Sequence, residues 1–126
     1  MKLPRKYLVA LLLLVIPGTV GGHHATALQF DVSRTIKLTG VISKLDWANP
    51  HVHLSLDVKV ANAVAELWDV ELASPGGVIV TGLSKDLLKL GTTISITGYP
   101  AKTKRTVCAK ELTLADGTTA TFVVGI

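Results

Sequence analysis

The side chains best suited to bind a metal ion are four histidines, which occur as two pairs, His23-His24 and His51 with His53. His51 and His53 begin a segment in which polar and apolar residues alternate. Alternate residues of a strand point to the same side, about 6.6 Å apart along the chain. Two imidazoles at this spacing can reach one ion, so the pattern predicts a transition-metal site, for copper or zinc.

A carboxylate from the next strand extends this predicted site. A hairpin whose turn centres on Asn62 places Glu71 opposite His53. Directly opposed residues have Cβ atoms about 5 Å apart. His51, His53 and Glu71 are therefore the predicted metal ligands of the strand face, provided that the register does not slip by one residue.

The N-terminus has the three-part layout of a signal peptide. Three basic residues precede a nearly continuous apolar run over residues 7–16, and small residues follow up to Gly22. The run is about half of the roughly 20 apolar residues that a membrane-spanning helix needs. We therefore expect cleavage of residues 1–22 to leave a periplasmic or secreted protein without a membrane span. An uncleaved anchor or a buried core helix is the alternative.

Cleavage after Gly22 would make His23 the first residue of the mature chain. The free amine and the imidazole of His23 could then chelate one copper ion together, and His24 could add a third nitrogen. His23 and His24 therefore join the predicted metal ligands.

The same strand face also allows interpretations without a metal. Histidines there can serve solubility alone, and His53 beside Glu71 would then be an ion pair that contributes roughly 0–1 kcal/mol. A barrel that binds a non-metal ligand around its second and third strands would use Asp69, with Trp47 and Asn49 at the rim. A ligand-binding or structural module of the cell envelope is therefore the alternative function.

Alternating polarity predicts six strands to carry these residues, at positions 34–45, 51–60, 65–73, 92–99, 106–114 and 119–124. Gly40 predicts a bend or bulge in the first strand. Ser84 predicts the N-cap of a short helix over residues 85–90, with an irregular or helical turn before it. Residues 23–33 have no clear period and are expected to form an N-terminal arm.

This order of elements predicts an all-β fold with one domain over residues 23–126. The expected architecture is a small, five- to six-stranded Greek-key barrel of the oligonucleotide/oligosaccharide-binding (OB) type. Its one short helix lies between strands three and four. A β-sandwich is the alternative, although six strands are few for the immunoglobulin type.

Charge and cysteine content limit the classes of function. Removing residues 1–22 takes away three of the 13 Lys and Arg and none of the 9 Asp and Glu, which leaves 10 basic residues against 9 acidic ones. A chain this close to neutral has no overall positive electrostatic field to attract a polyanion. We therefore expect a metal ion or small ligand as partner and no nucleic acid. No nucleophile elbow, phosphate loop or catalytic cysteine context occurs, and we expect no enzyme. Cys108, the single cysteine, is predicted to be an inert, half-buried thiol, with an intermolecular disulfide as the alternative.

Several segments together carry a resemblance to a known family: His23-His24-Ala25, the stretch from Trp47 to His51, and the stretch from Trp68 to Pro75. They resemble a family of small exported bacterial proteins known only as a domain of unknown function. The resemblance covers nearly the whole mature chain, with Ala25 where the family usually has Ser. It implies a periplasmic, barrel-like β domain and no established activity.

Overall fold

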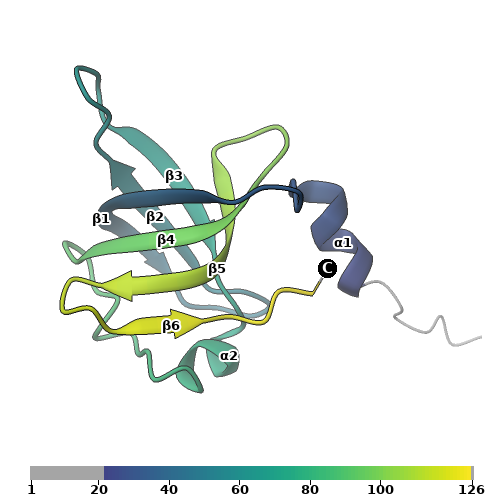
Figure 1. Cartoon of the computed structure of the whole chain (residues 1–126). Coiled ribbons are helices and arrows are strands. Elements are labelled where there is room, and N and C mark those ends of the chain that lie inside the picture. The colour runs from purple at the N-terminus through teal and green to yellow at the C-terminus, as the bar shows by residue number, and fades with distance from the viewer. Residues whose placement is uncertain (1–21, 126) are drawn as a thin grey trace, which may run out of the picture.

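Alternating polar and apolar residues form six strands within residues 22–125, the part of the chain that the structure, a computed structural model, describes (Figure 1). The elements in chain order are α1 (Gly22–Gln29), β1 (Ile36–Asp46), β2 (His53–Val58), β3 (Glu66–Glu71), α2 (Pro75–Ile79), β4 (Thr93–Pro100), β5 (Thr106–Leu114) and β6 (Thr119–Thr121). The predicted signal peptide, apart from Gly22, lies outside the described residues. Neither helix in the described part of the chain has the length and apolar character needed to cross a membrane.

The strands form one sheet in the order β3-β2-β1-β4-β5-β6, and this sheet closes on itself. Neighbouring strands of the sheet are antiparallel, whereas β3 and β5 pair in parallel at Asp69–Thr106, Val70–Val107 and Glu71–Cys108. This pairing turns β1 to β5 into a barrel, with β6 added at one edge (Figure 1). The predicted OB-like barrel, with a short helix between its third and fourth strands, is confirmed.

A row of aliphatic side chains decides which side of β2 faces the solvent. Val52, Leu54, Leu56 and Val58 are buried in the core. Burying one such side chain contributes about 1.5–3 kcal/mol, so turning β2 over would lose several times that amount. The residues between them, His53 included, are therefore held on the outer surface of the barrel, as the alternation predicted.

The irregularity of β1 lies at a different residue from the one predicted. The pairing of β1 runs without a break through Gly40, and the register with β2 shifts between Ile42 and Lys44. Gly40 is needed because a Cβ atom there would lie 2.7 Å from the carbonyl oxygen of Asp57. The glycine thus marks a close approach of two backbones, and the prediction of a bulge at Gly40 is wrong.

The short helix begins ten residues earlier than predicted. Ser74 is its N-cap, since the Ser74 hydroxyl accepts a hydrogen bond from the Gly77 amide at 3.1 Å, and Pro75 follows in the first turn. Residues 84–90 instead form turns, in which the Leu88 amide donates to the carbonyl oxygens of Ser84 and Lys85. A proline followed by two glycines is typical of a turn, but proline is also well suited to a first helical turn.

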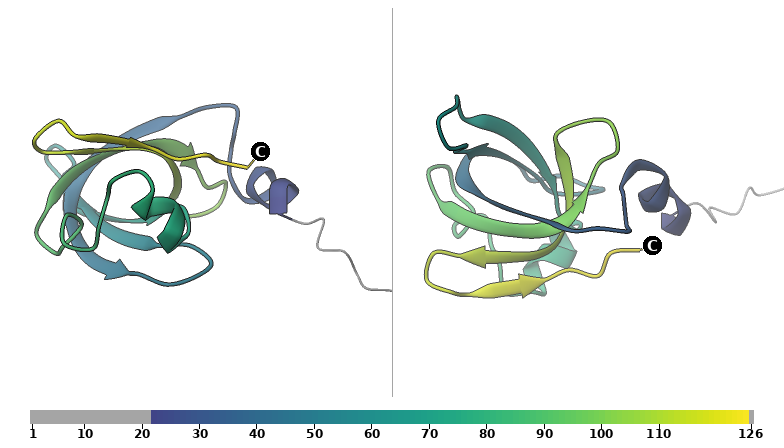
Figure 2. Two further views of the ribbon diagram at one scale, coloured as in Figure 1. Left: turned by 90° about the horizontal axis from the view of Figure 1, so that it is seen from below. Right: turned by 45° about the horizontal axis from the view of Figure 1, so that its top comes forward.

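The N-terminal arm contains a regular helix, α1, which the sequence did not predict. Phe30, just after α1, is buried and forms a bridge with Ala101 at the end of β4. The Lys102 ammonium donates to the carbonyl oxygen of Ala27 at 2.9 Å. These contacts fasten α1 to the loop between β4 and β5, next to the C-terminal tail (Figure 2).

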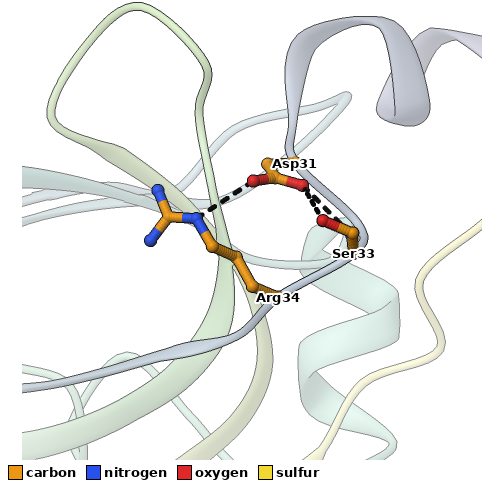
Figure 3. A network of polar contacts seen from close by, with 3 residues as sticks. All are labelled: Asp31, Ser33 and Arg34. Carbon is orange, nitrogen blue, oxygen red and sulfur yellow. Dashed lines mark hydrogen bonds and ion pairs between the residues drawn. The ribbon is translucent and has the colours of Figure 1, made fainter.

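A small polar network shapes the turn from α1 into β1 (Figure 3). One carboxylate oxygen of Asp31 accepts hydrogen bonds from the hydroxyl and the amide of Ser33, and the other accepts from Nε of Arg34 at 3.0 Å. The hydrogen bonds from Ser33, followed by that from Arg34, hold the pKa of Asp31 below its usual value. The backbone amide of Asp31 donates to the carbonyl oxygen of Pro100 at 2.8 Å, which keeps this turn on β4.

Candidate metal-binding site

The register of the β2–β3 hairpin places the predicted site residues on one face. Asn62 adopts a positive φ of 61°, and the Ala63 amide donates to the Val60 carbonyl oxygen at 3.2 Å, which closes the turn. His53 then lies directly opposite Glu71. The predicted register is confirmed.

The side chains pair along diagonals instead of straight across. Nδ1 of His51 lies 3.0 Å from a carboxylate oxygen of Glu71. Nδ1 of His53 lies 3.3 Å from each carboxylate oxygen of Asp69. Diagonal neighbours across a strand pair are within reach of long side chains, which explains why Glu71 contacts His51 and not the residue opposite it.

These contacts do not assemble the predicted set of His51, His53 and Glu71 around one point. Among the residues that the structure describes, no three or more His, Cys, Asp or Glu side chains are grouped so that they could hold a metal ion. The face presents two separate imidazole–carboxylate pairs instead. Glu71 thus lies within ion-pair distance of His51 in this arrangement.

The contact with Asp69 defines which ring nitrogen of His53 is available. An ionised carboxylate only accepts hydrogen bonds, so Nδ1 of His53 carries the proton in this contact. In a neutral imidazole this leaves the lone pair on Nε2. Metal-binding histidines commonly donate their second ring N–H to a carboxylate in this way, which fixes the tautomer and the orientation of the ring.

A cavity of about 70 Å³ lies beside the His51–Glu71 pair, between the end of β3, β5, α1 and the C-terminal tail. Thr26, His51, Glu71 and Cys108 give it polar lining, and the remaining lining residues are apolar. Ordinary small-molecule sites have volumes of about 300–1,000 Å³. The cavity therefore has room for an ion or a few atoms, and not for a sugar or a nucleotide.

Cys108 belongs to this site because β3 and β5 pair in parallel, which places it next to Glu71. Burial, and then the nearby charge of Glu71, raise the pKa of the Cys108 thiol to about 11. The sequence predicted its half-burial but gave no reason to connect it with Glu71. Only the closure of the barrel brings together these two residues, which are far apart in the chain.

Trp47 and Asn49 lie apart from this cavity. Trp47 packs against the hydrophobic core, with the Lys85 ammonium 5.8 Å from its ring centre. Asn49 is exposed in the turn before β2, where its peptide bond to Pro50 is cis. His23 and His24 lie in α1, two to three residues before Thr26, which lines the cavity.

Solved structures with the same fold include a single-stranded DNA binding protein. The mitochondrial single-stranded DNA binding protein Rim1 of S. cerevisiae matches 65% of this chain and 93% of its own, with a TM-score of 0.52 and 11% identity. The N-terminal domain of PriB from Thermoanaerobacter tencongensis matches 66% of this chain and 97% of its own, with a TM-score of 0.52 and 18% identity. At these identities the likeness shows the fold alone.

This finding overturns the exclusion of nucleic acid as a partner. That exclusion rested on the near-neutral charge of the mature chain, yet a single-stranded DNA binding protein shares this barrel. Net charge averages over the whole surface, whereas binding depends on the charge of one face. A balanced total therefore does not remove a class of polyanionic partners.

Comparison at the level of sequence identifies the family. No curated protein matches this chain. The profile of a family of unknown function, DUF6152, matches residues 12–109, which is most of the chain and includes both histidine pairs. The predicted resemblance to a domain of unknown function is confirmed, and the chain belongs to the DUF6152 family.

Proposed function

We propose that this protein is a small binding protein of the bacterial periplasm that takes up a Cu(II) or Zn(II) ion. The ligands are Nε2 of His51 and Nε2 of His53, with His23 or His24, or both, completing the donor set. Glu71 and Asp69 act as the carboxylates that orient the two rings. The protein binds the ion and does not catalyse a reaction with it.

The observation that carries this proposal is the orientation of the two imidazoles. Each ring has a carboxylate on Nδ1, at 3.0 Å for His51 and 3.3 Å for His53. His53 is the first residue of β2 and His51 lies two residues before it, and alternate residues of an extended chain are about 6.6 Å apart. Two Nε2 atoms held in this way meet the usual preference of Zn(II) and Cu(II) for imidazole ligands.

The second support is the size and place of the cavity. Its volume of about 70 Å³ suits an ion with its remaining waters better than an organic ligand. His51 lines the cavity and His53 does not, so the cavity supports the part of the site around His51. Thr26 also lines the cavity, and the histidine pair of α1 precedes Thr26 by two to three residues. Export to the periplasm, expected from the N-terminal segment, would bring the protein to a compartment outside cytoplasmic metal control.

Isothermal titration calorimetry with Cu(II) and Zn(II) tests the proposal on protein exported from cells that express the full chain. We expect one ion per chain, and at least a 100-fold loss of affinity in the His51→Ala/His53→Ala double variant. Glu71→Gln should weaken binding by about 10–100-fold, as is usual for a carboxylate that orients a ligand. Glu111→Gln serves as the matched control, because it removes an exposed carboxylate of β5 that does not line the cavity.

Two results would contradict the strand site. Unchanged affinity in the double variant would remove His51 and His53 from the ligand set, and complete loss in His23→Ala/His24→Ala alone would move the ion to the N-terminus.

A thermal-shift screen in EDTA tests the alternative function, a module that binds a non-metal ligand. A ligand that stabilises the protein in EDTA, and still does so in the double variant, would favour a non-metal binding module.

A further inference from the structure

Two loops project from the same side of the barrel, at the far end of the β2–β3 hairpin from His51 (Figure 1, Figure 2). They are the hairpin turn, residues 59–65, and the β4–β5 loop, residues 101–105, and we call them together the loop face. The Asp69 amide donates to the carbonyl oxygen of Arg105 at 3.0 Å, and the Arg105 guanidinium lies 3.1 Å from the carboxylate of Glu66. These two contacts hold the loops in a fixed relation to each other.

The loop face is the basic part of an otherwise acidic surface. It contains Lys59, Lys102, Lys104 and Arg105, all exposed, and no Asp or Glu. The rest of residues 23–126 then holds six basic residues against 9 acidic ones. The near-neutral total therefore hides a strong separation of charge. The carboxylate of Glu66, which directly follows the hairpin turn in the chain, is already paired with Arg105.

The hairpin turn adds an apolar tip to this basic region. All of residues 59–65 are exposed, and after Lys59 the only polar side chain among them is that of Asn62. Val64 is 89% exposed and Val60 40% exposed, and Leu67 at the base of the turn is 59% exposed. Of these aliphatic side chains, that of Val64 is the most exposed to solvent.

We propose that the loop face docks the protein onto a membrane surface with anionic lipid headgroups. Segments that bind at the membrane interface usually combine lysine and arginine with neighbouring exposed apolar residues. Val60 and Val64 enter the boundary between headgroups and acyl chains, and the basic residues contact the lipid phosphates. This binding is independent of the proposed metal site.

The composition of the loop face favours lipid over single-stranded nucleic acid. Proteins that bind single strands without sequence preference combine a basic groove with aromatic side chains on which the bases stack. The twelve residues of the loop face include no aromatic residue. Their apolar side chains are aliphatic, which suits acyl chains and gives bases no stacking surface.

Sedimentation with lipid vesicles tests the proposal on exported protein from cells that express the full chain. Vesicles of phosphatidylcholine with phosphatidylglycerol are compared with vesicles of phosphatidylcholine alone, which also measure any binding by an uncleaved N-terminus. We expect anionic vesicles to bind the protein, with binding that weakens as salt increases. Lys59→Gln/Lys104→Gln should lower the partition coefficient about 25-fold, at about fivefold for each charge.

Matched variants separate a specific surface from general stickiness. Lys37→Gln/Lys44→Gln removes two exposed charges elsewhere on the barrel and should leave partitioning within about twofold. Val64→Ser should weaken it by up to about tenfold, whereas Val80→Ser, at a site 84% exposed, should not. Circular dichroism verifies that each variant is folded.

Three outcomes would overturn the proposal. The first is equal binding to neutral and anionic vesicles, and the second is an equal effect of the two double lysine variants. The third is that the protein does not bind anionic vesicles but does bind an oligo-dT strand, and that this binding is lost in Lys59→Gln/Lys104→Gln. That result would assign the loop face to nucleic acid.

Discussion

The thiol of Cys108 lies half-buried in β5 beside Glu71, and this environment decides its chemistry. Burial is the larger cause, and the negative charge of Glu71 the smaller one, of a pKa near 11 in place of 9.0. The thiolate is the reactive form of cysteine, so the folded protein keeps this thiol nearly inert at neutral pH. A metal ion in the adjacent cavity would have to displace the proton before the sulfur could bind it.

We expect the alkylation of Cys108 by iodoacetamide in EDTA to be slow at pH 8 and to reach half its maximum rate near pH 11. Protein unfolded in guanidinium should instead reach half its maximum rate near pH 9. Because folding raises this pKa, the contribution of the neutral thiol to stability is complete below about pH 9 and is lost as the pH rises towards 11. Mass spectrometry of the alkylated protein measures both profiles.

Glu71→Gln provides the matched comparison for this titration. Removing the carboxylate removes the second cause of the raised pKa, so the rate profile should shift to lower pH. Coincident profiles for folded and unfolded protein would show that the thiol is not buried as the structure has it.

Single residues also show what the sequence could reveal about the site. The positive φ of Asn62 fixes the hairpin register, so the opposition of His53 and Glu71 was predictable from the turn alone. The actual partner of each imidazole was not predictable, because it depends on the lengths and directions of individual side chains. The position of Cys108 next to Glu71 depends on barrel closure, which leaves no local pattern in the sequence.

Among the elements, α2 depends on one cap residue. The Ser74 hydroxyl accepts from the Gly77 amide, and Pro75 supplies a backbone angle that suits the first turn. Val78 of this short helix is fully buried, so the helix covers one end of the core. Ser84, ten residues later, accepts only a long contact of 3.4 Å from the Leu87 amide.

Ser74→Ala should therefore cost about 1 kcal/mol of unfolding free energy. That loss corresponds to a fall in Tm of about 4–8 °C for a domain of this size. Ser84→Ala, the same change at the residue that the sequence favoured as a cap, should cost clearly less. Thermal denaturation followed by circular dichroism compares the two, and a larger loss at Ser84 would contradict the assignment of the cap.

The strands were predictable and the helices were not, for a physical reason. Strands that bury one face alternate in polarity, and β5 was found to the residue at Thr106–Leu114. The helix α2 spans only five residues, too few to show a helical period, and its glycines resemble a turn. The helix α1 has a mixed composition, and its position depends on contacts with Lys102 and Ala101, which are distant in sequence.

For the whole molecule, the feature that matters most is where the expected cleavage point lies relative to the strands. The expected cleavage point after Gly22 coincides with the first residue of α1. All six strands of the described residues lie beyond it, so we expect the sheet to persist when residues 1–22 are lost. The histidine pair of α1 would then be at the free end of the chain.

N-terminal sequencing of protein recovered from the periplasm should therefore begin at His23. Leu12→Arg, which interrupts the apolar run, should block export and leave the uncleaved chain in the cytoplasm. Cell fractionation and intact mass measure both results. Recovery of the periplasmic protein with residues 1–22 still attached would contradict the expected cleavage.

The short strand β6 has a consequence for how copies of this protein meet. β3 pairs with β5 at Asp69–Glu71 to close the barrel, and β6, the strand added outside it, has only three residues. Long, flat edges are the templates for fibrous polymerisation, and very short ones are not. The chain has one cysteine and so cannot form an internal disulfide. Its short outer strand is therefore a feature of its topology that protects it from aggregation.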